Sequence, residues 1–114
     1  MSYEINGKTV ETDANGYLVD INDWNEDVGK AIAETEGVEL TDEHWDVINY
    51  LRDAYINENG HQPNNREMIK AMSKKWGRKI GSKDLFVLFP GGGGPSKQAA
   101  KIGGLPESRR KGGY

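Results

Sequence analysis

Side chains able to hold a metal are sparse in this sequence. His44 lies close to Asp42, Glu43 and Asp46, but a metal site needs several ligands that converge, and no other residue has matching spacing. We therefore expect no metal. We expect the two histidines, His44 and His61, to lie at the surface or at a helix cap.

Acid–base or nucleophilic catalysis finds no support in the residue pattern either. Carboxylates are numerous in the first half, yet they fall on predicted solvent faces, and acid–base catalysis needs one carboxylate in an apolar pocket. The turn that surrounds a hydrolase nucleophile is missing around Ser73, Ser82, Ser96 and Ser108. The sequence therefore predicts a protein that is not an enzyme and that uses no cofactor.

A glycine-rich stretch, residues 91–97, reads Gly-Gly-Gly-Gly-Pro-Ser-Lys and superficially resembles a phosphate-binding loop. The order of glycine, lysine and hydroxyl residues in such loops is absent, and no predicted strand precedes the stretch. A hinge is therefore the better interpretation.

The chain of 114 residues contains no cysteine. This excludes a disulfide scaffold, a thiolate metal site, a paired-cysteine redox motif and a persulfide carrier. No apolar run is long enough to cross a membrane, and residues 1–12 lack the features of a signal peptide. The cytoplasm is the expected compartment.

Charge is divided unevenly along the chain. Residues 1–60 carry fifteen acids and three bases, whereas residues 61–114 carry three acids and twelve bases. Such asymmetry indicates a basic face or tail that meets an anionic partner. Alternatively, the two halves attract each other across the fold and the remaining charges are solvated.

The basic charge is concentrated in a predicted helix–turn–helix segment, residues 64–89. Its cations include Arg66, Lys70, Lys74, Arg78, Lys79 and Lys83. This layout is typical of DNA-binding proteins, although residues 85–89 are continuously apolar and leave few polar side chains to read a groove. A core helix pair with a basic rim is the alternative.

Residues typical of turns and helix caps predict where the strands and helices begin and end. Asn6-Gly7 predicts a hairpin that joins residues 3–5 to residues 8–12, and residues 17–19 are candidates for a short third strand. Four helices are predicted at 24–36, 42–59, 65–76 and 83–89, capped by Asp23, Thr41, Asn64 and Ser82. Residues 95–102 have room for one or two further helical turns. The expected folded body covers residues 1–90, and a flexible basic arm covers residues 91–114.

The order of several motifs resembles the DsrC/TusE family. Trp24 is followed by Leu-Thr-Asp-Glu-His-Trp at 40–45, by Pro63-x-x-Arg66, by Leu-Phe-Pro at 88–90, by Lys-Gln-Ala-Ala-Lys at 97–101 and by Gly-Leu-Pro at 104–106. The match covers nearly the whole chain. The resemblance implies a mainly α fold with a small N-terminal β-hairpin (α+β): a helical bundle that contains a helix-turn-helix and ends in a mobile C-terminal arm.

The resemblance also implies a sulfur-relay function, in which arm cysteines carry sulfur to sulfite reductase or toward tRNA 2-thiouridine synthesis. The two family cysteine positions are occupied here by Ala100 and Gly113, and the ending is basic. Persulfide chemistry requires a thiolate. The resemblance therefore implies the fold and the partner surfaces, whereas the missing sulfur argues against transfer.

Two functional hypotheses follow. The first is a cysteine-free paralogue, a monomer that binds sulfite reductase or a persulfide-relay complex and regulates sulfur metabolism. Its partner-binding arm would use Lys97, Lys101, Leu105, Pro106, Arg109, Arg110 and Lys111. The second is binding of DNA or tRNA through the basic helix pair and tail. Arg66 belongs either to a structural ion pair or to an arm contact.

Overall fold

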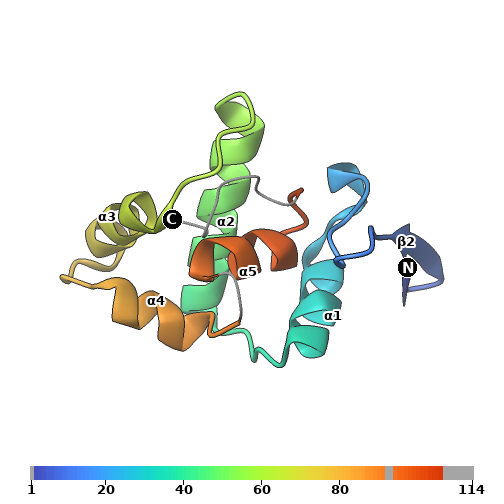
Figure 1. Ribbon diagram of the computed structural model, residues 1–114, viewed down its shortest axis with the longest axis horizontal. Coiled ribbons are helices and arrows are strands. Elements are labelled where there is room, and N and C mark those ends of the chain that lie inside the picture. The colour runs from blue at the N-terminus through green and yellow to red at the C-terminus, as the bar shows by residue number, and fades with distance from the viewer. Residues whose placement is uncertain (1, 92–93, 107–114) are drawn as a thin grey trace.

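The computed structural model describes residues 2–91 and 94–106. Two strands, one short 3-10 helix and five α-helices follow one another in this part of the chain (Figure 1). They are β1 (Ser2–Ile5), β2 (Lys8–Glu11), η1 (Ile21–Asp23), α1 (Glu26–Glu36), α2 (Asp42–Asn57), α3 (Asn65–Trp76), α4 (Ser82–Leu88) and α5 (Pro95–Ile102). The predicted α+β class, a helical fold with an N-terminal hairpin, is confirmed.

The N-terminal hairpin forms around the predicted turn. Asn6 and Gly7 have φ values of 53° and 80°, and β1 pairs antiparallel with β2 so that Tyr3 faces Val10. Positive φ at both positions is the geometry of the tight hairpin turn that Asn-Gly favours. The third strand is reduced to a single bridge between Thr12 and Leu18. Buried Val10 joins this hairpin to the core.

The first long helix begins later than predicted. Asp23 does not cap it, because Asp23 belongs to η1, whose own cap is Asp20. The side chain of Asn25 accepts a hydrogen bond from the Val28 amide at 3.0 Å and starts α1 at Glu26. Trp24 therefore lies in extended backbone between η1 and α1, outside the helix. This leaves its indole ring free to turn toward the C-terminal part of the chain.

His44 links the start of α2 to the end of α4. The helix begins after Thr41, as predicted, and ends at Asn57, two residues before the predicted end. The Thr41 amide donates to His44 Nδ1 at 3.1 Å, and His44 Nε2 lies 2.7 Å from the Leu88 carbonyl oxygen. This pattern requires the proton on Nε2, so that Nδ1 accepts and Nε2 donates. The predicted helix-cap role for His44 is confirmed, in a buried rather than an exposed position.

Replacing His44 tests this double role. His44→Ala removes both hydrogen bonds and the edge-on contact of the imidazole with Phe89, whose ring centroids lie 5.0 Å apart. We expect the free energy of unfolding to fall by about 2–4 kcal/mol, because the partly buried Leu88 carbonyl loses its donor and removal of the buried imidazole opens a cavity. Urea titration followed by circular dichroism measures the loss. His61→Ala, which removes the half-exposed histidine, is the control and is expected to cost less than about 1 kcal/mol.

Helices α3 and α4 form the predicted pair around a turn at residues 77–81. The side chain of Asn64 caps α3 by accepting from the Glu67 amide at 2.9 Å, and Gly77 ends it with φ of 66°. Glu67 does not complete a capping box, because its carboxylate lies 2.6 Å from His61 Nε2 instead. Gly81, not Ser82, caps α4, and the Asp84 carboxylate accepts from the Gly81 amide at 2.8 Å.

Helix α5 occupies the centre of the fold. In Figure 1 it crosses α2, with α1 on one side and α3 and α4 on the other, and it packs against all four. Ala99, Ala100, Ile102 and the following Leu105 belong to the main hydrophobic core. The packed core therefore extends to Leu105, past the boundary at residue 90 that the glycine run suggested. No helix in the described part of the chain combines the length and the apolarity needed to cross a membrane.

Candidate functional site

The candidate site is α5 together with the residues that follow it, because the predicted arm residues lie there. Pro95 starts the helix at the first helical position, where a missing N–H costs nothing. Ala100, at a position where the resemblance places a cysteine, is 5% exposed and faces the core. A side chain at position 100 is therefore shielded from solvent.

A glycine turn ends α5. Gly104 has φ of 73°, its amide donates to the Lys101 carbonyl at 3.1 Å, and the Leu105 amide donates to the Ala100 carbonyl at 3.0 Å. These two bonds make a Schellman motif, which satisfies the last helical carbonyls and turns the chain away from the helix axis. Leu105 is 1% exposed, so the turn is anchored by burial as well.

Three side chains from other elements hold this turn, and we call Trp24, Arg52 and Gln62 the arm-root clamp. Trp24 Nε1 donates to the Ile102 carbonyl at 2.8 Å, and Arg52 Nη1 donates to the Gly103 carbonyl at 2.6 Å. Gln62 Nε2 donates to the Pro106 carbonyl at 2.9 Å. The clamp therefore fixes the place and direction in which the chain leaves the core.

Arg52 and Trp24 also support each other. The Arg52 guanidinium lies 4.1 Å from the centroid of the Trp24 ring, a cation–π contact. Partial burial lowers the pKa of Arg52, but an arginine remains charged at neutral pH. Its planar fork therefore stacks on the indole and donates to the Gly103 carbonyl at the same time.

Removing the indole N–H measures the strength of the clamp. Trp24→Phe keeps an aromatic ring but leaves the Ile102 carbonyl without its donor. We expect a loss of about 1–3 kcal/mol in the free energy of unfolding, measured by chemical denaturation. Trp45→Phe is the matched control, because the Trp45 indole nitrogen makes no hydrogen bond within the described residues. An equal loss in both variants would show that the Trp24 hydrogen bond contributes nothing.

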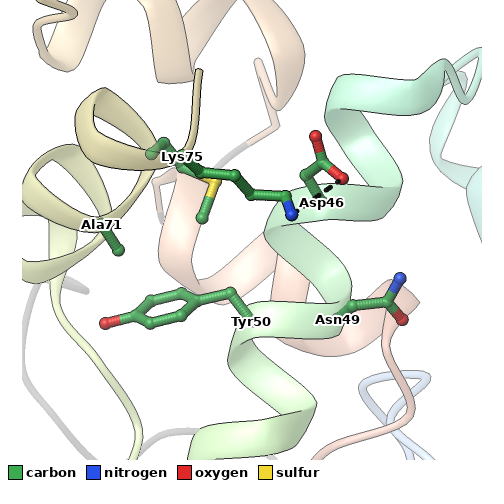
Figure 2. A pocket seen from close by; sticks show the side chains of 6 residues that line it. Asp46, Asn49, Tyr50, Ala71 and Lys75 are labelled. Atoms are coloured by element: carbon green, nitrogen blue, oxygen red, sulfur yellow. Dashed lines mark ion pairs between the residues drawn. The ribbon is translucent and has the colours of Figure 1, made fainter. Parts of the chain in front are cut away.

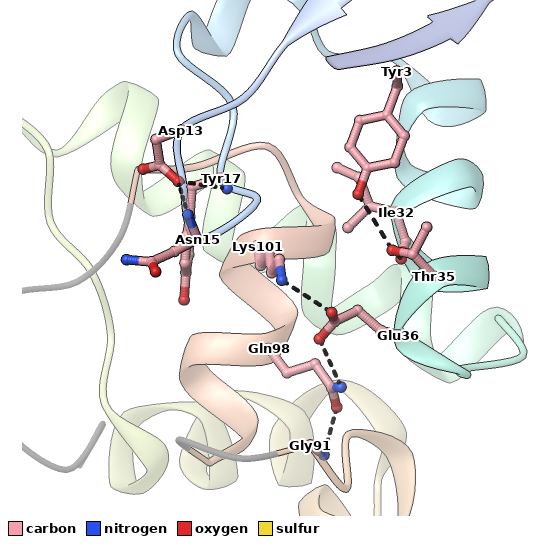
Figure 3. A network of polar contacts seen from close by, with 10 residues as sticks. All are labelled: Tyr3, Asp13, Asn15, Tyr17, Ile32, Thr35, Glu36, Gly91, Gln98 and Lys101. Atoms are coloured by element: carbon pink, nitrogen blue, oxygen red, sulfur yellow. Dashed lines mark hydrogen bonds and ion pairs between the residues drawn. The ribbon is translucent and has the colours of Figure 1, made fainter. Parts of the chain in front are cut away.

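A polar network ties the other face of α5 to the end of α1 (Figure 3). Lys101 Nζ lies 2.9 Å from Glu36 Oε2, and Gln98 Nε2 donates to Glu36 Oε1 at 3.3 Å. Gln98 Oε1 in turn accepts from the Gly91 amide at 2.9 Å. The network therefore connects Glu36 at the end of α1 to Gln98 of α5 and, through Gln98, to Gly91. Lys101 takes part in it through an ion pair with Glu36.

The predicted arm residues thus fall into three groups. Lys101 and Leu105 are engaged inside the fold, and Lys97 and Pro106 are half-buried at its surface. Three basic residues, Arg109, Arg110 and Lys111, lie outside the described residues, as does Gly113.

The basic residues of α3, α4 and the turn between them are exposed. Arg66, Lys70 and Lys74 recur every four residues and share one face of α3. Arg78 differs, because it lies 2.9 Å from Glu43 and stacks on Trp76. Within residues 2–91 and 94–106, no ion pair involves Arg66, Lys70, Lys74, Lys79 or Lys83. The predicted ion pair of Arg66 is therefore absent from this part of the chain.

Attraction between the two halves of the chain is visible in three ion pairs. Lys75 with Asp46, Arg78 with Glu43 and Lys101 with Glu36 each join a base of the second half to an acid of the first. The charge asymmetry thus serves the fold in part. The described residues hold no group of three or more metal-ligating side chains.

The sequence predicted part of this site. The family resemblance includes the Gly-Leu-Pro motif that follows α5, whereas Arg52 and Gln62 are absent from the predicted site residues. Arg52 sits among apolar positions of an amphipathic helix, and that signal alone indicates a partly buried arginine that needs a partner. Gln62, in a loop, carries no comparable signal.

Comparison with known proteins finds a matching family and similar relatives. The family model described as "DsrC like protein" matches residues 4–110. A sulfurtransferase TusE homolog of Haemophilus influenzae is 50% identical over 104 residues, covering 90% of this chain and 93% of that protein. Sulfurtransferase TusE of Escherichia coli K12 is 46% identical over 102 residues, covering 89% and 91%.

Solved structures agree in fold. The NMR structure of Allochromatium vinosum DsrC gives a TM-score of 0.85 at 41% identity, covering 96% of this chain and 98% of that one. The oxidized gamma-subunit of the dissimilatory sulfite reductase (DsrC) from Archaeoglobus fulgidus gives 0.85 at 33% identity with the same coverage. A chain in the crystal structure of dissimilatory sulfite reductase I gives 0.78 at 32% identity, covering 96% and 98%. The chain therefore belongs to the DsrC-like family.

Proposed function

We propose that this protein works in sulfur metabolism as a partner-binding member of the DsrC-like family that does not itself carry sulfur. Its relatives include proteins named sulfurtransferase TusE and a gamma-subunit of dissimilatory sulfite reductase. The observation that carries the proposal is the absence of cysteine from all 114 residues of a chain that otherwise keeps the family fold. Sulfur relay needs a thiolate, and no other side chain replaces it.

The surface proposed to meet the partner is the end of α5. The arm-root clamp fixes the chain at Pro106, so the following residues, with the predicted contacts Arg109, Arg110 and Lys111, start from a defined point. A fixed starting point reduces the entropy lost when the segment docks. Lys97 and Pro106, half-buried at the surface, would lie at the edge of this contact.

The proposed partners are sulfite reductase or a persulfide-relay complex, and the proposed compartment is the cytoplasm. The chain would bind as a monomer and would occupy the place that a cysteine-bearing carrier uses. Its effect on the pathway would then be regulatory, because occupation of that place without transfer lowers the flow of sulfur.

A binding experiment tests this proposal. The tagged chain is immobilised beside a cysteine-bearing TusE or DsrC relative, and purified sulfite reductase and a persulfide-relay complex are passed over both. We expect this chain to retain at least one of the two complexes, with a Kd within about tenfold of that of the relative. Retention of both complexes by the relative and of neither by this chain would refute the proposal.

Nucleic-acid binding through α3 and α4 stays a separate, untested prediction. The outward side of α4 includes Val87, which is 74% exposed and offers no hydrogen bond to a base edge. If the chain nevertheless binds duplex DNA or tRNA through the exposed cations of α3, α4 and the turn between them, affinity must fall steeply as salt rises. Fluorescence anisotropy over a range of salt concentrations makes that measurement.

A further inference from the structure

A groove between α2 and α3 lies apart from α5 and the arm-root clamp. It has a volume of about 340 Å³, within the range of small binding sites, and Figure 2 shows the side chains around it. Helix α2 contributes Asp46, Asn49 and Tyr50, and helix α3 contributes Ala71, Met72 and Lys75. We call this feature the α2–α3 groove.

The floor of the α2–α3 groove is apolar. The Tyr50 ring projects from α2 across the space toward α3, where Ala71 faces it (Figure 2). Met72 also lines the groove and is buried in the core. The Tyr50 hydroxyl makes no hydrogen bond within the described part of the chain. An incoming apolar side chain would therefore find a ring, a methyl group and a thioether, with a polar hydroxyl at the border.

One end of the α2–α3 groove is basic. Lys75 reaches across it, but its Nζ is 4.0 Å from Asp46 Oδ1, while the other Asp46 oxygen accepts from Trp76 Nε1 at 2.8 Å. The Lys75 side chain is about half exposed. Lys74 and Lys70, exposed on the adjoining face of α3, have no ion pair within the described residues. Asp46 therefore pairs with Lys75 alone, and the positive charges of Lys70 and Lys74 are not neutralised by an ion pair within the described residues.

Two acidic residues, Glu58 and Glu67, act on Tyr50 without lining the α2–α3 groove. Burial raises the pKa of Tyr50, and the negative charges of Glu67 and Glu58 raise it further. Glu67 is held by His61 at 2.6 Å. A nucleic acid carries negative charge along its whole length and would meet Glu58 and Glu67 unfavourably. A peptide segment, by contrast, is able to place its acidic residues at one end alone.

We propose that the α2–α3 groove docks an acidic, amphipathic segment of a protein partner. Apolar side chains of that segment pack over Tyr50, Ala71 and Met72, and its carboxylates meet Lys70, Lys74 and Lys75. An apolar centre with a charged rim is the usual anatomy of a protein interface, and helices in grooves are a common form of peptide recognition. The surface is independent of α5, so it goes beyond the proposed function and would add a second point of contact.

The test uses the whole chain labelled with ¹⁵N and a synthetic helical peptide. The peptide carries leucines along one face and glutamates at one end. A second peptide has the same composition in scrambled order, and a short DNA duplex is the third probe. We expect the first peptide to shift the amide signals of residues 46–50 and 71–75 most strongly, and the scrambled peptide to bind at least about fivefold more weakly, because its apolar face is broken.

Two matched variants decide the role of the groove. Lys74→Glu is expected to weaken binding of the first peptide at least about fivefold, since a favourable charge becomes a repulsive one. Lys83→Glu makes the same change of net charge on α4, outside the groove, and is expected to leave the affinity within about twofold. Ala71→Arg fills the groove at a half-exposed helical position and is expected to abolish the shifts at Tyr50 while the fold, followed by circular dichroism, is retained.

Several outcomes would overturn the proposal. Signal shifts located elsewhere, or equal binding of the ordered and scrambled peptides, would show that the groove is not a docking site. Equal effects of Lys74→Glu and Lys83→Glu would show that net charge alone attracts the peptide. Stronger shifts of the groove signals by the DNA duplex than by the peptide would assign the surface to nucleic acid. None of these outcomes bears on whether α5 and the arm root bind a sulfur-relay partner.

Discussion

Incubation of this chain with a persulfide-loaded donor protein is expected to leave its mass unchanged. In sulfur relay the acceptor thiolate attacks the outer sulfur of the donor persulfide, takes that sulfur over as its own persulfide and releases the donor as a thiolate. The chain has no cysteine to supply the attacking sulfur. Intact-protein mass spectrometry should therefore detect no added sulfur, whereas a cysteine-bearing TusE relative in the same mixture gains one atom.

A cysteine variant separates the missing thiol from a missing interaction. Gly113→Cys places a thiol at the penultimate position that the family resemblance implies, and we expect it to accept one sulfur atom from the donor. Ala100→Cys is the internal comparison, since position 100 is 5% exposed and a thiol there is shielded from the donor. Sulfur uptake by the unmodified chain would contradict the account, and so would a Gly113→Cys protein that never accepts sulfur.

Substitution of Gly104 is expected to have the largest effect on stability. An added Cβ would lie 2.6 Å from Cγ of Trp24, and the residue has φ of 73°. A non-glycine residue in that region costs about 1–2 kcal/mol, and overpacking against the partly buried Trp24 ring adds about 1–3 kcal/mol. Gly104→Ala should therefore lower the free energy of unfolding by about 2–5 kcal/mol, a large part of the total for a small domain. Urea unfolding followed by tryptophan fluorescence measures it.

Gly37 offers a matched control for that experiment. It ends α1 with φ of 72°, nearly the same as Gly104, but a Cβ there meets nothing within 4 Å. Gly37→Ala therefore carries the backbone strain alone. The difference between the two variants isolates the contact of Gly104 with Trp24, and equal losses would show that the indole does not pack tightly against the turn.

The local structure of the chain was predictable where a residue acts on its own neighbours. Asn6-Gly7 requires positive φ at two successive positions, and Asn64 satisfies an amide three residues along the chain, so each signal is complete within a short segment. The start of α1 was misplaced because Asp20, Asp23 and Asn25 are all good cap residues. The Trp24 side chain, which lies between two of them, bonds the Ile102 carbonyl of α5, a contact that the neighbouring residues do not reveal.

The candidate site was less predictable because it is made by contacts between distant segments. The Trp24 indole bonds a carbonyl 78 positions away, and Arg52 bonds one 51 positions away. The run Gly91–Gly94 suggested that an arm begins there, since glycine carries no side chain to pack. Burial of Ala99, Ala100 and Ile102 beyond that run is a property of the assembled core. The motifs of the family resemblance located the site, and the structure supplied its geometry.

The arm-root clamp holds the turn from which the proposed partner-binding segment continues. It joins the segment between η1 and α1, helix α2 and the loop before α3 to the turn after α5, so the proposed partner-binding segment starts from residues that also stabilise the fold. Under the proposed function, this chain, which has the clamp but no thiol, would occupy a carrier's place without accepting sulfur. An experiment must therefore distinguish a chain that occupies the carrier's place on a partner from a chain that also transfers sulfur.

Competition in a reconstituted relay tests that distinction most directly. A persulfide-loaded donor complex transfers labelled sulfur to a cysteine-bearing relative while this chain is added in increasing amounts. The account predicts that transfer to the relative slows progressively, falling to about half when the chain reaches the concentration of its Kd for the donor and the relative is well below its own Kd, with no label on the chain itself. Undiminished transfer at saturating amounts of the chain, or label recovered on the chain, would contradict it.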